Sequence, residues 1–374
     1  MGGAEGFPPR FGQGGAQACR VEGMKLNIAI VGAGMAGITA ARTLKQAGHA
    51  VTVFEKSRGA GGRMATRETT HGTFDHGAQY FTVRDARFAT ALQQVPGTVA
   101  ICRPWSANAV RVLDPNGRVF EAARQTGEAH FVPMPGMNAL VRHWAEPLGD
   151  AVHLSTQVHR LAREPNGRWT LWANALVEGR LRDQAFAGFD RVLLAMPQAQ
   201  TSALLQQAGS GAGLQALQDR LEGVDVAPCW TLMLAFPQAS GLRNFGPQWN
   251  AARSTHHRVA WLARESSKPG RGTLERWTVQ ASAEWSQEHL EDPEGRVTPK
   301  LVRAFSELTG IRVEPAFALA HRWRYAKTEC PLGEPFLYDA GLGLGTCGDW
   351  HLGCRVEDAF VSGLSLALHL CEPA

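Results

Sequence analysis

Residues 28–37 read IAIVGAGMAG, and this stretch decides the fold. The β-branched run LNIAIV (26–31) that leads into the glycines is typical of a central parallel strand. A helical pattern then extends to Gly48, a residue that favours a helix end, and AVTVFE (50–55) predicts the next strand. Strand, glycine-rich turn, helix and second strand in this order predict a dinucleotide-binding α/β unit.

The residues of this turn have distinct roles in such a unit. Gly32 permits the tight turn, Gly34 lets a pyrophosphate approach the backbone, and Gly37 brings the helix against the strand. The helix N-terminus offers free N–H groups to the phosphates. Glu55, 23 residues after Gly32, is placed to accept hydrogen bonds from an adenosine ribose. We therefore expect the cofactor to be contacted by Gly32, Ala33, Gly34, Met35, Ala36, Gly37, Glu55 and Lys56.

A second glycine-rich turn, SRGAGGR (57–63), follows the second strand, where a plain NAD domain usually continues into a helix. Its Gly62 allows another close approach of backbone to cofactor. Arg63 offers a charge-assisted, bidentate contact to phosphate. This turn favours FAD over NAD; the alternative is a flexible surface loop with an ordinary exposed arginine.

The stretch FDHGAQYFT (74–82) combines buried aromatics with a glycine kink and the amide of Gln79. An apolar segment with a few convergent polar groups is what a flat amphipathic ligand needs. The alternative is a core turn in which the amide of Gln79 is satisfied by the protein itself.

These three stretches, IAIVGAGMAG, FEKSRGAGGRM (54–64) and FDHGAQYFT, resemble the FAD-dependent amine oxidase superfamily. Within it they are most similar to renalase-like proteins, especially the bacterial ones. The similarity runs from about Met24 to the C-terminus and continues in WLARESSKPGR (261–271), AHRWRYA (320–326) and CGDWHLGCRVEDAFVSG (347–363).

The resemblance implies where the flavin lies. The stretch 74–82 would run beside the isoalloxazine ring, with Gln79 and Tyr80 lining it on the catalytic side. No general base is identified. The remaining cofactor contacts that it implies are room for the ring at Gly77 and Ala78, backbone groups of Val158 on the adenine, Gly348 and Asp349 on the ribityl or ribose hydroxyls, and Arg355 and Val356 at the start of a final helix aimed at the flavin N1–C2 edge. For Asp349, the other interpretation is an N-cap of that helix.

The fold class that follows is α/β. We expect a Rossmann-like FAD-binding domain and a second, α+β substrate domain with a mostly antiparallel sheet, in the topology of amine oxidases and p-hydroxybenzoate hydroxylase. The predicted ranges are 24–80, 150–205 and 330–374 for the FAD-binding domain and 81–149 and 206–329 for the substrate domain.

Composition excludes several classes. No apolar run reaches about 18 residues, so no membrane span is expected, and a net charge of +4 without a Lys/Arg block does not indicate nucleic-acid binding. Seven cysteines without CxxC pairs favour a reducing cytoplasm, and the histidines lack ligand spacing, so no metal is expected. Residues 1–23 are glycine-rich, which predicts a disordered tail; a start codon at Met24 is the other explanation.

The resemblance implies a flavin oxidase or dehydrogenase with non-covalent FAD. Its small-molecule substrates would be 2- or 6-dihydroNAD(P), with O2 as acceptor and H2O2 as product. The alternatives are an amine or carbon–carbon oxidase of the same superfamily, or a nucleotide-binding protein without activity. Superfamily amine oxidases carry a lysine near flavin N5, whereas none of the six lysines here falls in a flavin-lining motif; only Lys268 is left open. The sequence also leaves open whether Trp261, Trp323, Tyr325 and Trp350 face the flavin, and whether Arg264, Arg322 and Arg324 bind substrate phosphates.

Overall fold

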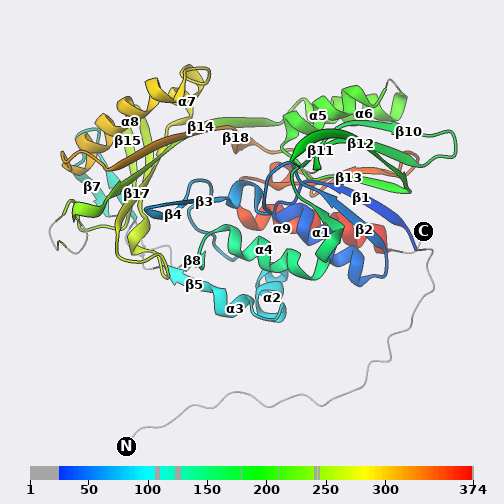
Figure 1. Cartoon of the computed structure of the whole chain (residues 1–374), viewed down its shortest axis with the longest axis horizontal. Coiled ribbons are helices and arrows are strands. Elements are labelled where there is room, and N and C mark those ends of the chain that lie inside the picture. The colour runs from blue at the N-terminus through cyan, green and yellow to red at the C-terminus, as the bar shows by residue number, and fades with distance from the viewer. Residues whose placement is uncertain are drawn as a thin grey trace, which may run out of the picture.

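A computed structural model describes residues 25–105, 110–122, 128–177, 179–209, 211–239, 242 and 245–372. The tail predicted for residues 1–23 lies outside the described residues. Figure 1 shows two sheet-based bodies, one built around β1, β2 and β13 and the other around β14 to β18, with the small hairpin β3–β4 between them. Within the described residues, no helix is long and apolar enough to cross a membrane.

The first body is organised by a six-stranded sheet in the order β19-β20-β13-β1-β2-β9. Its strand pairs are parallel except β19–β20. Side chains of β1 alternate between two hydrophobic clusters: Ile28 and Ile30 face one side, Ala29 and Val31 the other. The strands are β1 (Asn27–Val31), β2 (Ala50–Phe54), β9 (Val152–His153), β13 (Arg191–Leu194), β19 (Leu337–Asp339) and β20 (Leu344–Thr346).

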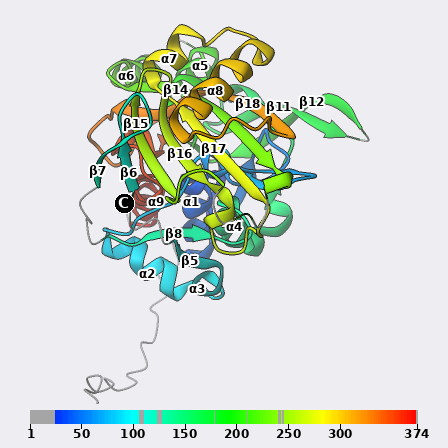
Figure 2. The same ribbon diagram turned by 90° about the vertical axis from the view of Figure 1, so that its left-hand side faces the viewer.

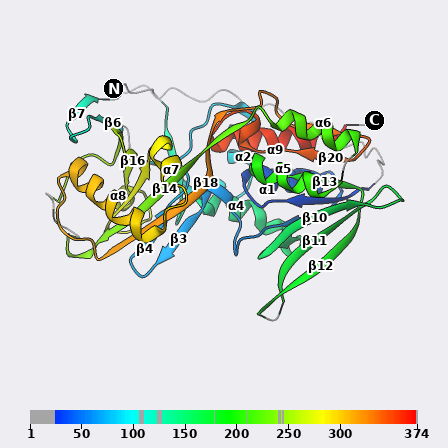
Figure 3. The same cartoon turned by 90° about the horizontal axis from the view of Figure 1, so that it is seen from above.

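Helices and a second sheet cover the two faces. On one side, α1 (Met35–Gln46) packs on α9 (Val356–Cys371), and a Cβ at Gly363 would lie 2.2 Å from the carbonyl oxygen of Ala36. The other side carries α5 (Gln198–Gln207), α6 (Ala212–Leu221) and the antiparallel sheet of β10 (Thr156–Arg163), β11 (Trp169–Val177) and β12 (Arg180–Phe189). Figure 3 shows this sheet fanning outward, with β12 at its edge.

The second body is a seven-stranded sheet in the order β18-β14-β17-β16-β15-β6-β7, antiparallel except where β15 meets β6. Helices α7 (Ala283–Glu288) and α8 (Glu294–Thr309) cover one face of it (Figure 2). The strands are β6 (Val110–Leu113), β7 (Val119–Ala122), β14 (Asp225–Phe236), β15 (Ala251–His256), β16 (Val259–Arg264), β17 (Glu275–Ala281) and β18 (Phe317–Cys330).

Short elements join the two bodies. The predicted fold class, a Rossmann-like unit plus a mostly antiparallel α+β body, is confirmed, whereas the residue boundaries of the two domains stay predictions. The remaining short elements, which include those between the bodies, are η1 (Gly62–Met64), β3 (Thr66–Thr69), β4 (Gly72–Asp75), α2 (Ala86–Gln94), α3 (Thr98–Ile101), β5 (Cys102–Trp105), β8 (His130–Pro133), α4 (Asn138–Ala145), η2 (Glu146–Ala151), η3 (Pro237–Ala239), η4 (Glu265–Ser267) and η5 (Asp349–His351).

Candidate active site

The two glycine turns of the first body face each other. A Cβ at Gly62 would lie 3.2 Å from the Cα of Gly34, and a Cβ at Gly37 would lie 1.9 Å from the carbonyl oxygen of Gly32. The N–H of Gly61 donates to the carbonyl of Ala33 at 3.0 Å. The turns therefore form one backbone cradle at the end of β1, where only glycine leaves room.

Glu55 links the two glycine turns by hydrogen bonds. Its Oε2 accepts from the N–H of Ala33 and its Oε1 from the N–H of Ser57, each at 2.8 Å, and the side chain is buried. Each oxygen keeps a second lone pair for a ribose hydroxyl. The N–H of Thr156 donates to the Glu55 carbonyl at 2.8 Å, which places Val158, two residues further along β10, near this end of the cradle. Lys56 is exposed.

Arg63 and Asp349 meet although 286 residues separate them. Arg63 Nη2 lies 2.5 Å from Asp349 Oδ1, and its Nη1 is buried without a hydrogen-bond partner among the described residues. A buried guanidinium nitrogen with a spare N–H beside a glycine cradle fits a phosphate-bearing cofactor. The N-cap interpretation of Asp349 is wrong: α9 is capped at Arg355, whose N–H donates to Asp358 Oδ2 at 2.9 Å.

The stretch 74–82 lies directly against the second glycine turn. A Cβ at Gly77 would sit 2.0 Å from the carbonyl oxygen of Arg63, and the N–H of Ala78 donates to that oxygen at 2.9 Å. Gly77 is thus required for contact with the chain at Arg63. The expectation that it leaves room for the flavin ring stays a prediction.

The side-chain amide of Gln79 forms its hydrogen bonds within the protein. Its Nε2 donates to the carbonyls of Asp75 and Gly77, the latter at 3.1 Å, and its Oε1 accepts from Lys268 Nζ at 3.2 Å. The amide has no spare N–H, so its side chain braces the turn. Tyr80 is half-buried, with its ring 4.1 Å from that of His130.

Four fully buried ionic side chains lie behind Gln79, and we call Asp75, Glu265, Lys268 and Arg271 the buried ion cluster. Lys268 Nζ lies 3.1 Å from Asp75 Oδ2 and 2.9 Å from Glu265 Oε1, and Arg271 Nη2 lies 2.7 Å from Asp75 Oδ2. With its bond to Gln79, Lys268 therefore donates three hydrogen bonds, the full number available to an ammonium group.

The two carboxylates of the cluster differ in environment. Burial acts to raise the pKa of Asp75, but the charges of Lys268 and Arg271 outweigh it and lower that pKa to about 2. Burial raises the pKa of Glu265, with Lys268 opposing the effect. The two carboxylates also differ in their partners: Asp75 pairs with Arg271 and accepts from Thr66 and from the N–H of Met137, whereas Glu265 Oε2 has no partner among the described residues.

Lys268 is the lysine whose position the sequence leaves open. In the structure it lies beside the stretch 74–82, where it contacts Gln79 itself. Because 189 residues separate Lys268 from Gln79, nothing local in the sequence indicates this contact, although Lys268 stands in the stretch 261–271 that carries part of the resemblance. Its ammonium also lies 5.4 Å from the ring centroid of Trp105.

A neutral aromatic group borders the other side of Gly77. The ring of His76 stacks on Trp323 at 5.2 Å and meets His321 at 4.8 Å, and Trp323 Nε1 donates to the His76 carbonyl at 2.8 Å. Burial, with the charges of His321 and Arg67, lowers the pKa of His76 to about 3. Burial and Arg67 lower the pKa of His321 to about 4. Both imidazoles are therefore neutral at pH 7.

Several other candidates lie elsewhere. Trp350 is in the core, where its Nε1 donates to the Met196 carbonyl at 2.9 Å. Arg264 donates to loop carbonyls, and Arg322 and Arg324 pair with Glu291 at the surface. In the part of the chain that the structure describes, no His, Cys, Asp or Glu cluster has the makings of a metal site.

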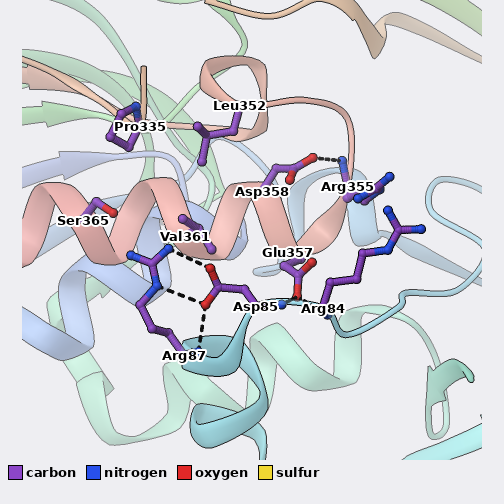
Figure 4. A pocket seen from close by; sticks show the side chains of 10 residues that line it. All are labelled: Arg84, Asp85, Arg87, Pro335, Leu352, Arg355, Glu357, Asp358, Val361 and Ser365. Carbon is purple, nitrogen blue, oxygen red and sulfur yellow. Dashed lines mark hydrogen bonds and ion pairs between the residues drawn. The ribbon is translucent and has the colours of Figure 1, made fainter. Parts of the chain in front are cut away.

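Two cavities adjoin these residues. The smaller, about 540 Å³, lies against the start of α9, and its charged groups bond to one another: Arg87 to Asp85, and Glu357 to the N–H groups of Arg84 and Asp85 (Figure 4). The larger, about 1000 Å³, is bounded by the loop after β2, the strand β3, the helix α4 and the end of β18.

Comparison with protein families identifies the fold's relatives. A model described as flavin containing amine oxidoreductase matches residues 120–370, and one described as NAD(P)-binding Rossmann-like domain matches residues 30–94. The chain belongs to the flavin-containing amine oxidoreductase family. Its cofactor is FAD, and the glycine cradle, Glu55, Arg63 and Asp349 are the groups that would hold it.

The curated relatives match over a short segment only. A 4,4'-diapophytoene desaturase of Staphylococcus haemolyticus is 45% identical over 60 residues, 16% of this chain and 12% of that protein. The corresponding enzyme of Staphylococcus aureus is 44% identical over 52 residues, 14% of this chain and 10% of the relative. The matched region thus spans about a tenth of these relatives.

Solved structures match over nearly the whole chain. A putative protoporphyrinogen oxidase from Exiguobacterium sp. 255-15 superposes with a TM-score of 0.71 at 12% identity, covering 93% of this chain and 99% of that one. Cyclohexylamine oxidase from Brevibacterium oxydans gives a TM-score of 0.66 at 14% identity, with the same coverage of both chains. At such identities the likeness establishes the fold alone.

Proposed function

We propose that the protein is a renalase-like oxidase of 2- or 6-dihydroNAD(P), using non-covalent FAD. In the overall reaction a dihydronicotinamide, O2 and a proton give NAD(P)+ and H2O2. Bound FAD would accept the hydride from the ring carbon and pass the electrons to O2. The chain's own task is to hold that carbon about 3–3.5 Å from the acceptor atom and to keep water away.

One observation carries the proposal: the segments that resemble renalase-like proteins meet at one place. Lys268 from the stretch 261–271 binds Asp75 and Gln79, and Trp323 from 320–326 binds the carbonyl of His76. These contacts all fall on the stretch 74–82. The resemblance therefore concerns one three-dimensional site and not only scattered local sequence.

The groups around this site suit a reaction without a general base. Hydride loss from a dihydropyridine produces an aromatic pyridinium, so no proton has to be removed from the substrate. Lys268 has three oxygen partners, and His76, with a pKa of about 3, is a weak base. Neither is free to act as a strong base at pH 7.

The second candidate is an amine oxidase, which the cyclohexylamine oxidase fold match favours. A neutral amine can also give up hydride without a base, so the chemistry alone does not separate the two. They differ in charge: an amine substrate is a cation in water, whereas a dihydronicotinamide nucleotide carries phosphates.

The test is anaerobic reduction of the bound flavin. We expect rapid bleaching of its visible absorbance by 2- or 6-dihydroNAD(P), and little response to ordinary NADH, monoamines or polyamines. Reduction by a primary amine at a rate comparable to turnover, with none by the dihydronicotinamide isomers, would refute the proposal in favour of the amine oxidase.

A further inference from the structure

The larger cavity has a cationic lining that the site described so far does not use. Arg58, Arg67 and Arg142 all border it, from the loop after β2, from β3 and from α4. Within the described residues none of the three forms an ion pair. Uncompensated arginines that line one cavity from three separate elements offer guanidinium groups to an anionic ligand.

The acidic residues of the lining do not cancel this charge. Glu68 and Glu146 also border the cavity, so three cations stand against two anions. Glu146 is already bonded to His143 at 3.2 Å. In the smaller cavity, by contrast, Arg87 is bonded to Asp85 within the lining itself. The smaller cavity is lined by three arginines and three acidic residues, whereas the larger cavity has an excess of arginine.

The cavity adjoins the expected phosphate site of FAD, because residues 57–62 of the second glycine turn line it. Among the described residues that line it, none belongs to the turn at 32–37, and Arg63 is not included. Gly62 lines it, however, and so does His76, which precedes Gly77. A ligand in this cavity would thus reach from the surface to the stretch expected to border the flavin.

The inner end of the cavity repels cations and accepts a neutral ring. His76 and His321 lie beside Arg67, whose Nη2 is 3.4 Å from His321 Nδ1, and that charge helps to keep both imidazoles neutral. An ammonium ion would meet the same repulsion from Arg67. A planar uncharged ring would meet His76, which lines the cavity and is stacked on Trp323.

We propose that this cavity binds the pyrophosphate of a dinucleotide substrate through Arg58, Arg67 and Arg142, with the reduced ring directed toward His76. The assignment rests on the proposed function for the identity of the ring, whereas the anion site rests on the cavity alone. It gives the enzyme a physical reason to prefer a phosphate-bearing substrate over an amine.

The test compares substrates with and without phosphates. Arg67→Gln, Arg142→Gln and the double variant are made, with Arg180→Gln on the exposed edge strand β12 as control. In the double variant we expect the KM for the dihydronicotinamide dinucleotide to rise about 10–100-fold, with the saturating rate of flavin reduction unchanged. The KM for the matching dihydronicotinamide riboside, which lacks phosphates, should rise much less than the KM for the dinucleotide. Arg180→Gln should match the wild type with both substrates.

A binding measurement tests the anion site separately from the proposed function. ADP-ribose is titrated into FAD-saturated holoenzyme by calorimetry, and we expect it to bind the wild type but not the double variant. If neither the dinucleotide nor the riboside reduces the flavin, the proposed function fails while loss of ADP-ribose binding still supports the anion site. Unchanged KM and unchanged ADP-ribose binding in the double variant overturn the site, and so does a wild type that does not bind ADP-ribose.

Discussion

Replacing Lys268 by Met should destabilise the protein in a pH-dependent way. The substitution keeps the length of the stem and removes the charge that faces Asp75 and Glu265. Asp75 would keep Arg271, but Glu265 would keep only the hydroxyl of Thr278 at 2.8 Å. Breaking a buried ion pair from one side costs about 3–5 kcal/mol. For a chain of 374 residues this corresponds to a melting temperature lower by about 4–7 °C.

The pH dependence comes from Glu265. Burial already raises its pKa, and Lys268 is the strongest opposing influence, so the variant should raise it further. A carboxyl whose folded pKa exceeds the unfolded one loses stability as pH rises between the two values. The loss of stability caused by Lys268→Met should therefore be larger at pH 8 than at pH 5.5.

Thermal unfolding of FAD-saturated protein, followed by circular dichroism, measures both effects. Lys327→Met, which breaks a surface pair whose side chains are 60% and 42% exposed, should cost less than about 1 kcal/mol. The double variant Lys268→Met, Glu265→Gln should recover most of the loss, because no unpaired carboxylate remains. A deficit that is independent of pH, or a double variant no more stable than the single one, would refute the ionic origin of the effect.

Three further predictions concern the cradle and the core. Arg63→Ala should weaken FAD binding about 10–100-fold, since charge-assisted hydrogen bonds contribute about 1.5–3 kcal/mol; equal retention of FAD on dialysis against high salt would show that Arg63 does not touch the phosphates. Gly77→Ala should lower both stability and FAD content, because its Cβ would sit 2.0 Å from the Arg63 carbonyl oxygen. Gly59→Ala, which has open space around it, should change neither. Similar FAD content in the two variants would contradict this reasoning. Burial lowers the pKa of His351 to about 3, so the imidazole is neutral in the folded protein. As pH falls below about 6.5, the unfolded chain takes up a proton that the folded chain does not, and this lowers the free energy of unfolding by about 2 kcal/mol at pH 5. In His351→Gln, melting temperature should fall less steeply between pH 6.5 and 5 than in the wild type, and an identical slope would count against this origin.

Sequence reasoning worked best where one local rule decides the structure. The glycine turn at Gly32 and the helix that starts after Arg355 follow from spacing and capping over a few residues, and both are where the sequence predicts them.

What the sequence did not reveal are pairings between distant charges. Arg63 and Asp349 were each expected to touch the cofactor, but nothing local indicates that they bind each other. Lys268 appeared to be an isolated lysine, because its partners Asp75 and Gln79 lie in another segment. Two roles are open for the amide of Gln79 from the sequence, lining the flavin or hydrogen bonding within the protein, and the structure shows the hydrogen bonds within the protein. Which oxygen an amide or ammonium binds depends on tertiary contacts that no periodicity encodes.

The contacts that hold the stretch 74–82 have a consequence for the order of biosynthesis. Its partners Lys268, Gln280 and Trp323 lie 193, 203 and 247 residues beyond the groups that they bind. At about 5–20 residues per second, a ribosome adds the last of them some 10–50 s after this stretch has been made. Until then Asp75 and Gln79 remain hydrated on the nascent chain. Asp349 and α9, which complete the first body around the glycine turns, are synthesised later still. FAD can therefore be seated only when nearly the whole chain has been made, which makes flavin loading a late step in the maturation of this protein.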